Sequence, residues 1–304
     1  MVWDWLIVGS GFGGSVSALR LAEKGYSVLV LEKGRRWRQE DFPKSNWNLR
    51  RWLWAPAIGF RGFFKMTFLR HVTALSGVGV GGGSLVYANT LPTPEKGFFT
   101  AEEWGQLADW QKELAPHYKT ARRMLGATDN PLDTAPDRAL RAIAGRLGRE
   151  DHFRTAPVGV YFGDAGQTVP DPYHGGEGPD RTGCTMCGGC MTGCRYGAKN
   201  TLDRNYLWLA EHRGVTIQAD TRVTWVQPLT DNGGEAAGNG DGRYLVSARE
   251  RRGAFKRADR SFQAKNVIFA GGALGTVELL LRLRKSFQGL PELSHRVGDR
   301  VRTN

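Results

Sequence analysis

The first thirty residues alternate between the apolar pattern of a buried strand and that of an amphipathic helix. Residues 6–8 form a short continuous apolar run, and an amphipathic helix is expected over residues 13–24. Gly25 ends that helix, and a second apolar strand is expected over residues 26–31. This strand–helix–strand order predicts an α/β fold built on a parallel sheet.

The same two patterns return farther along the chain. The later expected elements are helices within 101–125 and 137–148, two short strands within 215–228, a polar loop over 230–242, a strand over 243–250, and a strand–glycine–helix unit whose helix opens near Leu274. No internal repeat is visible. The pattern therefore predicts an α/β protein whose strands come from both the beginning and the end of the sequence.

A glycine fingerprint joins the first strand to the first helix. Gly9 permits a tight turn, Gly11 lets the backbone approach a pyrophosphate, and Gly14 lets the helix pack closely on the strand. The unpaired N–H groups at the helix N-terminus attract phosphate. Glu32 ends the second strand, where a carboxylate can accept hydrogen bonds from ribose hydroxyls. These features predict a dinucleotide site, for FAD or NAD.

A second glycine cluster lies in the stretch GVGVGGGSLV, which begins at residue 77. Five of its first seven residues are glycine, and Ser84 follows them. So dense a run favours backbone that lies against a flat or phosphorylated ligand. The alternative is a loop that crosses close to a neighbouring strand. The pair Gly271–Gly272 could bring a third stretch of backbone to the same ligand, or could form an ordinary turn.

The basic residues are concentrated in one segment. The 304-residue chain has 41 glycines and a net charge of +12, and residues 35–71 hold nine lysines and arginines against Glu40 and Asp41. Trp37, Trp47, Trp52 and Trp54 lie among them. Interleaved basic and aromatic residues suit an anionic membrane surface, a nucleic acid, or a segment packed on the protein itself. We expect no nucleic acid as partner, and peripheral membrane contact stays open.

No stretch approaches the roughly 20 apolar residues that are needed to span a bilayer. The N-terminus enters a strand at once and has no charged region typical of a signal peptide. Four clustered cysteines suit a reducing compartment. The expected location is the cytoplasm, with peripheral membrane association as a further option.

Three stretches together resemble the glucose–methanol–choline (GMC) family of FAD oxidoreductases, and in particular its bacterial cholesterol-oxidase-like branch. They are VGSGFGGS with Glu32, GVGVGGGSLV near 77–86, and VIFAGGALGT near 267–276. The resemblance spans nearly the whole chain. It implies a FAD-binding Rossmann-like domain of the GMC type with an inserted, incomplete substrate domain.

The resemblance also implies the residues that contact the cofactor. These are Gly9, Gly11, Gly14, Glu32, Gly81, Gly82, Gly83, Ser84, Asn89, Val223, Gly272 and Ala273. The first three would hold the pyrophosphate, Glu32 the adenosine ribose, and Val223 the adenine. The family often has an asparagine near the flavin where this chain has Tyr87, so either Tyr87 or Asn89 contacts the ring.

The implied domain limits follow from the same likeness. The FAD-binding domain would comprise 1–34, 72–90 and 198–285. The basic aromatic segment would be 35–71, and residues 91–197 would form part of a substrate or cap region with a cysteine-rich loop. Residues 286–304 would be the start of a truncated substrate region. GMC proteins are considerably longer, so the chain resembles an N-terminal fragment. The catalytic base is expected beyond Asn304, and none of the six histidines lies in a matching motif.

The implied reaction is oxidation of an alcohol by hydride transfer to the flavin, with oxygen or another electron acceptor. The preferred substrate is a sterol such as cholesterol or another lipid alcohol, which would place the protein in steroid or lipid metabolism. Two alternatives are an NAD-dependent reductase that uses the same strand–helix–strand unit, and a FAD-binding fragment without turnover.

All four cysteines lie in one short loop. Cys184, Cys187, Cys190 and Cys194 have the spacing of bacterial ferredoxins, except that Arg195 replaces the usual proline. An iron–sulfur cluster would let electrons leave the flavin one at a time. Zinc fits less well, because four-thiolate zinc sites usually pair two separated C-x-x-C segments. Unmetallated thiols or a disulfide are the remaining alternatives.

Overall fold

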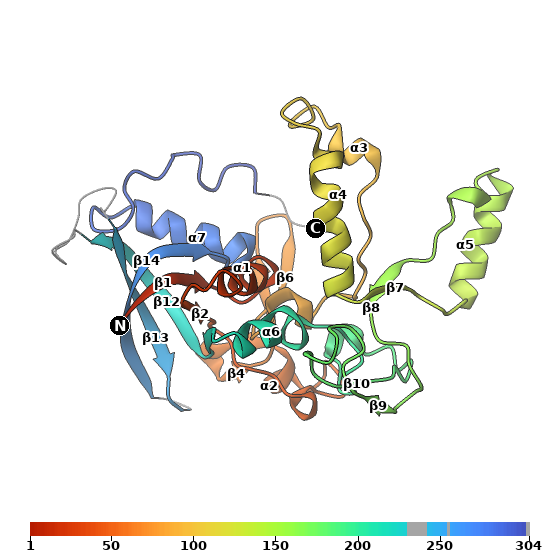
Figure 1. Cartoon of the computed structure of the whole chain (residues 1–304), viewed down its shortest axis with the longest axis horizontal. Coiled ribbons are helices and arrows are strands. Elements are labelled where there is room, and N and C mark those ends of the chain that lie inside the picture. Colours follow the sequence, from red (N-terminus) through yellow and green to blue (C-terminus); the bar gives the residue numbers. More distant parts are fainter. Residues whose placement is uncertain (230–241, 254–255, 302–304) are drawn as a thin grey trace.

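The computed structural model describes residues 1–229, 242–253 and 256–301 (Figure 1). Almost all of the polar loop expected over 230–242 therefore lies outside the described residues. Within them, the elements at the start of the chain appear where the apolar pattern predicts. The first helix, expected over 13–24, is α1 (Phe12–Ala22), and the strand expected over 26–31 is β2 (Val28–Leu31).

A six-stranded sheet forms the centre of the fold. In spatial order its strands are β11 (Thr216–Gln218), β2, β1 (Val2–Val8), β14 (Arg257–Phe269), β13 (Arg243–Arg251) and β12 (Thr221–Leu229). The first four run parallel, and β13 is antiparallel to both of its neighbours. Helices cover both faces of the parallel strands, which explains why β1 and β2 read as nearly continuous apolar runs.

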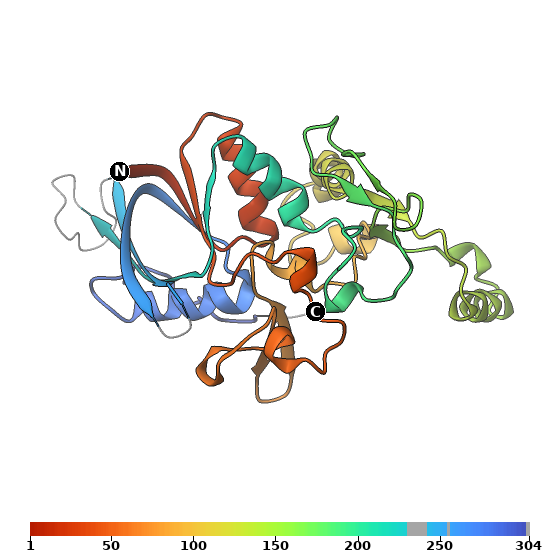
Figure 2. The same ribbon diagram turned by 90° about the horizontal axis from the view of Figure 1, so that it is seen from below.

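Alternate residues of the central strands feed two separate hydrophobic cores. Ile7 and Val30 pack on one face with α1 and α6 (Tyr206–His212). Leu6 and Leu29 point to the other face, where Leu279 of α7 (Gly272–Arg284) completes the packing. Figure 2 shows α7 on one side of the sheet, with α1 and α6 on the other. The predicted α/β class is confirmed, as a layered Rossmann-like arrangement.

The remaining elements lie outside this sheet. They are α2 (Leu49–Trp52), α3 (Lys96–Phe99), α4 (Trp110–Met124), α5 (Ala135–Arg146), and four small two-stranded pairs: β3 (Trp54–Ala55) with β4 (Phe60–Arg61), β5 (Phe64–Phe68) with β6 (Thr73–Gly77), β7 (Ala127–Asp129) with β8 (Pro157–Gly159), and β9 (Thr168–Val169) with β10 (Arg181–Thr182). Helix α5 projects far from the sheet (Figure 1). The predicted domain limits stay predictions, and the one at residues 71/72 falls in the turn between β5 and β6.

The helices are short relative to a lipid bilayer. Among the described residues, no helix combines the length and the apolar character that crossing a membrane requires.

Candidate dinucleotide site

Two of the three fingerprint glycines are packed too tightly to carry a side chain. A Cβ atom on Gly14 would lie 2.0 Å from the carbonyl oxygen of Gly9, and one on Gly9 would lie 2.5 Å from that of Ala270. Gly11 differs, because nothing lies within 4 Å of the position of its Cβ. Gly11 also precedes α1, whose N-terminus has no side-chain cap. Gly9 and Gly14 therefore shape the turn, and Gly11 leaves room for an anionic ligand at the helix N-terminus.

Glu32 is buried and binds the glycine turn directly. Its Oε2 accepts hydrogen bonds from the backbone nitrogen of Ser10 at 3.1 Å and from Ser10 Oγ at 2.8 Å. Its Oε1 accepts one from the backbone nitrogen of Gly34 at 2.9 Å. Since an ionised carboxylate has about four acceptor positions, roughly one remains for a ribose hydroxyl. The Glu32 side chain thus fixes the turn and retains about one acceptor position for a hydrogen bond from a ligand.

The second glycine run meets the first turn in space. The backbone nitrogen of Gly81 donates to Ser10 Oγ at 3.2 Å, and a Cβ on Gly82 would lie 2.7 Å from the Cα of Gly11. Ser84 holds the run in place, because its Oγ donates to the carbonyl of Gly81 at 2.7 Å and accepts from the Leu202 nitrogen at 3.0 Å. Two glycine segments about seventy residues apart therefore form one surface.

Two further predicted segments reach the same region. The nitrogen of Ala270 donates to the carbonyl of Val8 at 2.9 Å, which places the turn before α7 against Gly9. Gly272, the first residue of α7, has φ +75° and no neighbour within 4 Å of its Cβ position, and Ala273 follows it. The first residue of β12 lies next to Glu32, because the backbone nitrogen of Thr221 donates to the Glu32 carbonyl at 2.8 Å. Val223 lies two residues farther along the same strand. The structure thus gathers the predicted cofactor segments around one turn.

Both candidates for contact with the flavin ring have a buried polar atom without a partner. Asn89 is 2% exposed, adopts a left-handed backbone (φ 68°), and leaves its Oδ1 unbonded. The Tyr87 hydroxyl is also buried and unbonded, and burial raises the pKa of Tyr87 well above its usual range. The Tyr87 ring meets Phe12 edge-to-face at 5.7 Å between centroids. Both side chains stay candidates for the ring contact.

A cavity of about 290 Å³ lies beside the glycine run. Its walls are Trp37, Arg38, Gln39, Glu40, Phe42, Leu85, Cys194, Gly197, Lys199, Thr201, Asp203 and Arg204. The Oδ1 atom of Asp203 is buried without a partner and would lie 3.4 Å from a Cβ on Gly81. Burial raises the pKa of Asp203. This cavity could not be predicted from the sequence, because its residues come from three distant segments.

A buried lysine connects the glycine run to the cysteine loop. Lys199 is 1% exposed, and its Nζ donates to the carbonyls of Leu85 at 3.1 Å, Tyr87 at 2.8 Å and Cys190 at 3.0 Å. Desolvation by burial lowers the pKa of Lys199 to about 8. Three carbonyl oxygens use all three N–H bonds of an ammonium group. Lys199 therefore holds two predicted site segments together and is not free to act on a ligand.

The four cysteines lie near one another without forming a ligand shell. All four are free thiols, Cys187 is exposed, and the cavity that they help to line has a volume of only about 20 Å³. Such a space holds about one water molecule. Among the described residues, which include the whole loop, no three His, Cys, Asp or Glu side chains are placed to hold a metal ion. The iron–sulfur and zinc predictions gain no support from this arrangement.

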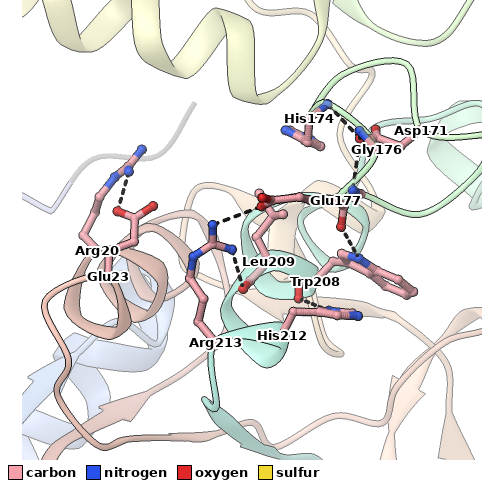
Figure 3. A network of polar contacts seen from close by, with 11 residues as sticks. Arg20, Glu23, Asp171, His174, Gly176, Glu177, Trp208, Leu209, His212 and Arg213 are labelled. Atoms are coloured by element: carbon pink, nitrogen blue, oxygen red, sulfur yellow. Dashed lines mark hydrogen bonds and ion pairs between the residues drawn. The ribbon is translucent and has the colours of Figure 1, made fainter.

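The loop before the cysteines is fixed by a separate polar network (Figure 3). Asp171 accepts four backbone N–H groups, from Tyr173, His174, Gly176 and Gly178, and these bonds lower its pKa against the opposing effect of burial. In the neighbouring segment, Trp208 donates to the Glu177 carbonyl and Arg213 donates to the Glu177 carboxylate of this loop. This network has a structural role at the edge of α6, apart from the glycine turns.

Of the six histidines only His174 is half-buried, and the other five are exposed.

Comparison with known proteins identifies the family. Residues 7–38 match the model of an NAD(P)-binding Rossmann-like domain, and residues 177–298 match that of the GMC oxidoreductases. The chain is 49% identical to a cholesterol oxidase of Acinetobacter baumannii over 99% of its own length and 54% of that protein. The chain belongs to the GMC oxidoreductase family. The predicted resemblance is confirmed.

A second relative agrees with this assignment, and a solved structure is similar in fold. A cholesterol oxidase of Mycobacterium tuberculosis is 48% identical over 99% of this chain and 51% of its own length. The crystal structure of pyridoxine 4-oxidase from Mesorbium loti is similar in fold, with a TM-score of 0.52 at 17% identity over 92% of this chain and 51% of that one. The chain spans about half the length of the curated relatives that it matches.

Proposed function

We propose that this chain is the FAD-binding part of a GMC oxidoreductase that oxidises an alcohol, with a sterol such as cholesterol or another lipid alcohol as the substrate. The observation that carries the proposal is the contact between the two glycine segments. Gly82 packs against the backbone of Gly11, and the Gly81 nitrogen donates a hydrogen bond to Ser10 Oγ. A nicotinamide site needs only the first segment. The cholesterol oxidases among the relatives, at 48–49% identity, support the substrate class.

The residues of the site fit FAD. The open space at Gly11 and the uncapped start of α1 suit a pyrophosphate, and the remaining acceptor position of Glu32 suits a ribose hydroxyl. The unbonded polar atoms of Tyr87 and Asn89 suit the polar edge of a flavin ring. Bound FAD would supply the hydride acceptor for alcohol oxidation. The protein's own part, in the residues of this site, is to bind and orient the cofactor.

FAD content tests this proposal. The purified chain should be yellow and release one FAD per chain on denaturation. Anaerobic addition of cholesterol or a long-chain alcohol then reports turnover by bleaching the flavin absorption. If air restores the yellow colour, oxygen is the electron acceptor. If it does not, another oxidant is required. A colourless protein that binds NADH and not FAD would favour the NAD-dependent reductase. A yellow protein that no alcohol bleaches would be a FAD-binding unit without turnover.

The cysteine loop gives a second prediction. Because its thiols enclose room for about one water molecule, we expect anaerobically purified protein to contain FAD without stoichiometric iron or acid-labile sulfide. Cys187→Ser and Cys190→Ser should then retain full FAD content. Iron and sulfide in near-equal amounts, lost in both variants, would instead establish the iron–sulfur cluster that the spacing suggested.

A further inference from the structure

The cavity beside the glycine run is lined by residues other than those assigned to FAD. Its volume is about 290 Å³, and none of the residues that the resemblance assigns to the cofactor is among its walls. Leu85, which follows Ser84, forms one wall, and the other walls come from the segments 37–42 and 194–204. The cavity is therefore of a size that suits a small organic molecule, and it lies outside the predicted cofactor contacts.

Part of the cavity wall is aromatic and firmly packed. Trp37, Phe42 and Phe63 pack into a small aromatic core, in which Trp37 stacks on Phe42 with 5.4 Å between the ring centroids. Trp37 is 5% exposed, and its Nε1 is buried without a hydrogen-bond partner. Trp37 and Phe42 also line the cavity, together with Leu85. This part of the wall suits the apolar portion of an organic ligand.

Arg204 brings a positive charge to the cavity. Its Nη2 donates to the carbonyl of Asp180, and its Nε is buried without a partner. In the part of the chain that the structure describes, no carboxylate forms an ion pair with Arg204. A buried N–H without a partner is rare in folded proteins. The unbonded Nε in a cavity wall therefore indicates a place for an external acceptor.

The other charged groups of the cavity leave the positive charge in excess. Asp203 lines the same space, but its Oδ1 has no partner, and burial raises the pKa of Asp203, which disfavours its charged form. The basic residues in the walls are Arg38, Lys199 and Arg204, against Asp203 and Glu40. The charge of the walls thus favours an anion, and most of all where Asp203 is protonated.

We propose that this cavity binds a small organic carboxylate, with its carboxylate at Arg204 and its apolar part against Trp37 and Phe42. An ionised acceptor forms a stronger hydrogen bond to a guanidinium N–H than a neutral one does, and it also compensates the charge. Inorganic phosphate would use Arg204 but would leave the aromatic wall without a partner. A neutral molecule would use the aromatic wall alone. The inference goes beyond the proposed function and does not rest on it.

Such a ligand would connect three segments that are far apart in the sequence. Leu85 lies beside Ser84, whose Oγ links the glycine run to Leu202, and residues 194–204 contain Leu202 itself. A molecule that binds this arrangement and not the unfolded chain stabilises the folded state. Binding should therefore raise the thermal unfolding temperature as the ligand concentration increases.

Calorimetric titration of the full chain tests this site without any alcohol. Benzoate is the probe, and it should bind with a dissociation constant of about 1 mM or lower. Benzamide is a neutral molecule of nearly the same shape, and it should bind roughly tenfold more weakly or not at all. Arg204→Gln removes the guanidinium group and should weaken benzoate binding by roughly tenfold or more.

Two exposed wall residues give a test that does not disturb the packing. Arg38→Gln should weaken benzoate binding by about threefold and Glu40→Gln should strengthen it by about threefold, since each removes one exposed charge of opposite sign. Neither variant should change the affinity for benzamide. Arg213→Gln and Glu177→Gln are the matched controls, because these residues pair with each other outside the cavity (Figure 3). Both controls should bind benzoate as the parent chain does.

Several results would overturn the proposal. They are absence of benzoate binding, equal binding of benzamide, tighter binding of inorganic phosphate than of benzoate, and a change of the same sign in Arg38→Gln and Glu40→Gln. Loss of benzoate binding in FAD-loaded protein would show that the cavity is part of the cofactor site, and would overturn it too. Flavin content is measured on the same samples. Failure of the carboxylate site would leave flavin content unchanged, whereas failure of the proposed function would leave benzoate binding intact.

Discussion

Glu32→Ala should weaken FAD binding by roughly ten- to hundredfold, because a charge-assisted hydrogen bond to ribose contributes about 1.5 to 3 kcal/mol. The structure adds an effect on the fold itself. Removing the carboxylate leaves the Ser10 and Gly34 nitrogens without their acceptor, while the Ser10 hydroxyl keeps the Gly79 carbonyl at 3.4 Å. A buried donor without a partner costs about 1 to 3 kcal/mol. The free energy of unfolding should therefore fall by a few kcal/mol even without FAD.

Two measurements separate these effects. Urea unfolding of the FAD-free protein reports the loss of stability, and titration with FAD at a temperature where the variant is folded reports affinity. Glu23→Ala is the matched control, because Glu23 forms only a surface ion pair with Arg20 at the far end of α1 and should change neither quantity by more than about 1 kcal/mol. A Glu32→Ala protein with parental stability and parental FAD affinity would contradict both roles.

The local part of the fold could be predicted because its signals lie close together in the sequence. The β1–α1–β2 unit depends on an apolar run, an amphipathic period and glycines at fixed spacing, all within 32 residues. Close backbone contacts were the expected reason for glycine at positions 9 and 14. In the structure, a Cβ atom on either residue would lie within 2.5 Å of a backbone carbonyl oxygen. Glu32 was found because it ends the second strand of the same unit.

The contacts between distant segments could not be predicted in this way. Ser10 occupies a variable position of the glycine fingerprint, so nothing in the spacing shows that its hydroxyl joins Glu32 to Gly81. Lys199 resembles any surface lysine in sequence, and only the fold places three backbone carbonyls around it. The density of glycines in the second run suggested contact with a ligand, and the resemblance to a family assigned that run to the cofactor site, but neither showed that it meets the first turn at Ser10 and Gly11.

The cysteine loop is a case in which a spacing suggests more than the structure supports. A ligand shell requires four sulfur atoms to converge on one centre at about 2.3 Å from a metal ion such as zinc. The loop GGCMTGC instead turns sharply at Gly193, whose Cβ position is occupied by the Phe42 ring. Packing against the aromatic core thus sets the path of this loop. Residue spacing alone carries no information on that packing.

The fingerprint glycines should separate folding from cofactor binding. In Gly14→Ala the new methyl group would lie 2.0 Å from the Gly9 carbonyl oxygen, a distance that only a backbone shift can relieve. Overpacking of this kind costs about 1 to 3 kcal/mol and sometimes more. Gly14→Ala should therefore unfold at a clearly lower temperature with or without FAD.

Gly11→Ala should behave in the opposite way. Its methyl group meets no atom within 4 Å, and its backbone angle of φ −71° is open to any residue, so the FAD-free protein should unfold at nearly the parental temperature. The methyl group would occupy the space through which a pyrophosphate approaches α1. FAD affinity should fall at least as far as in Glu32→Ala. Gly97→Ala in α3, where a methyl group also meets nothing, should change neither property. If Gly11→Ala bound FAD as tightly as the parent chain, the pyrophosphate would have to lie elsewhere, and the assignment of this turn as the cofactor site would be wrong.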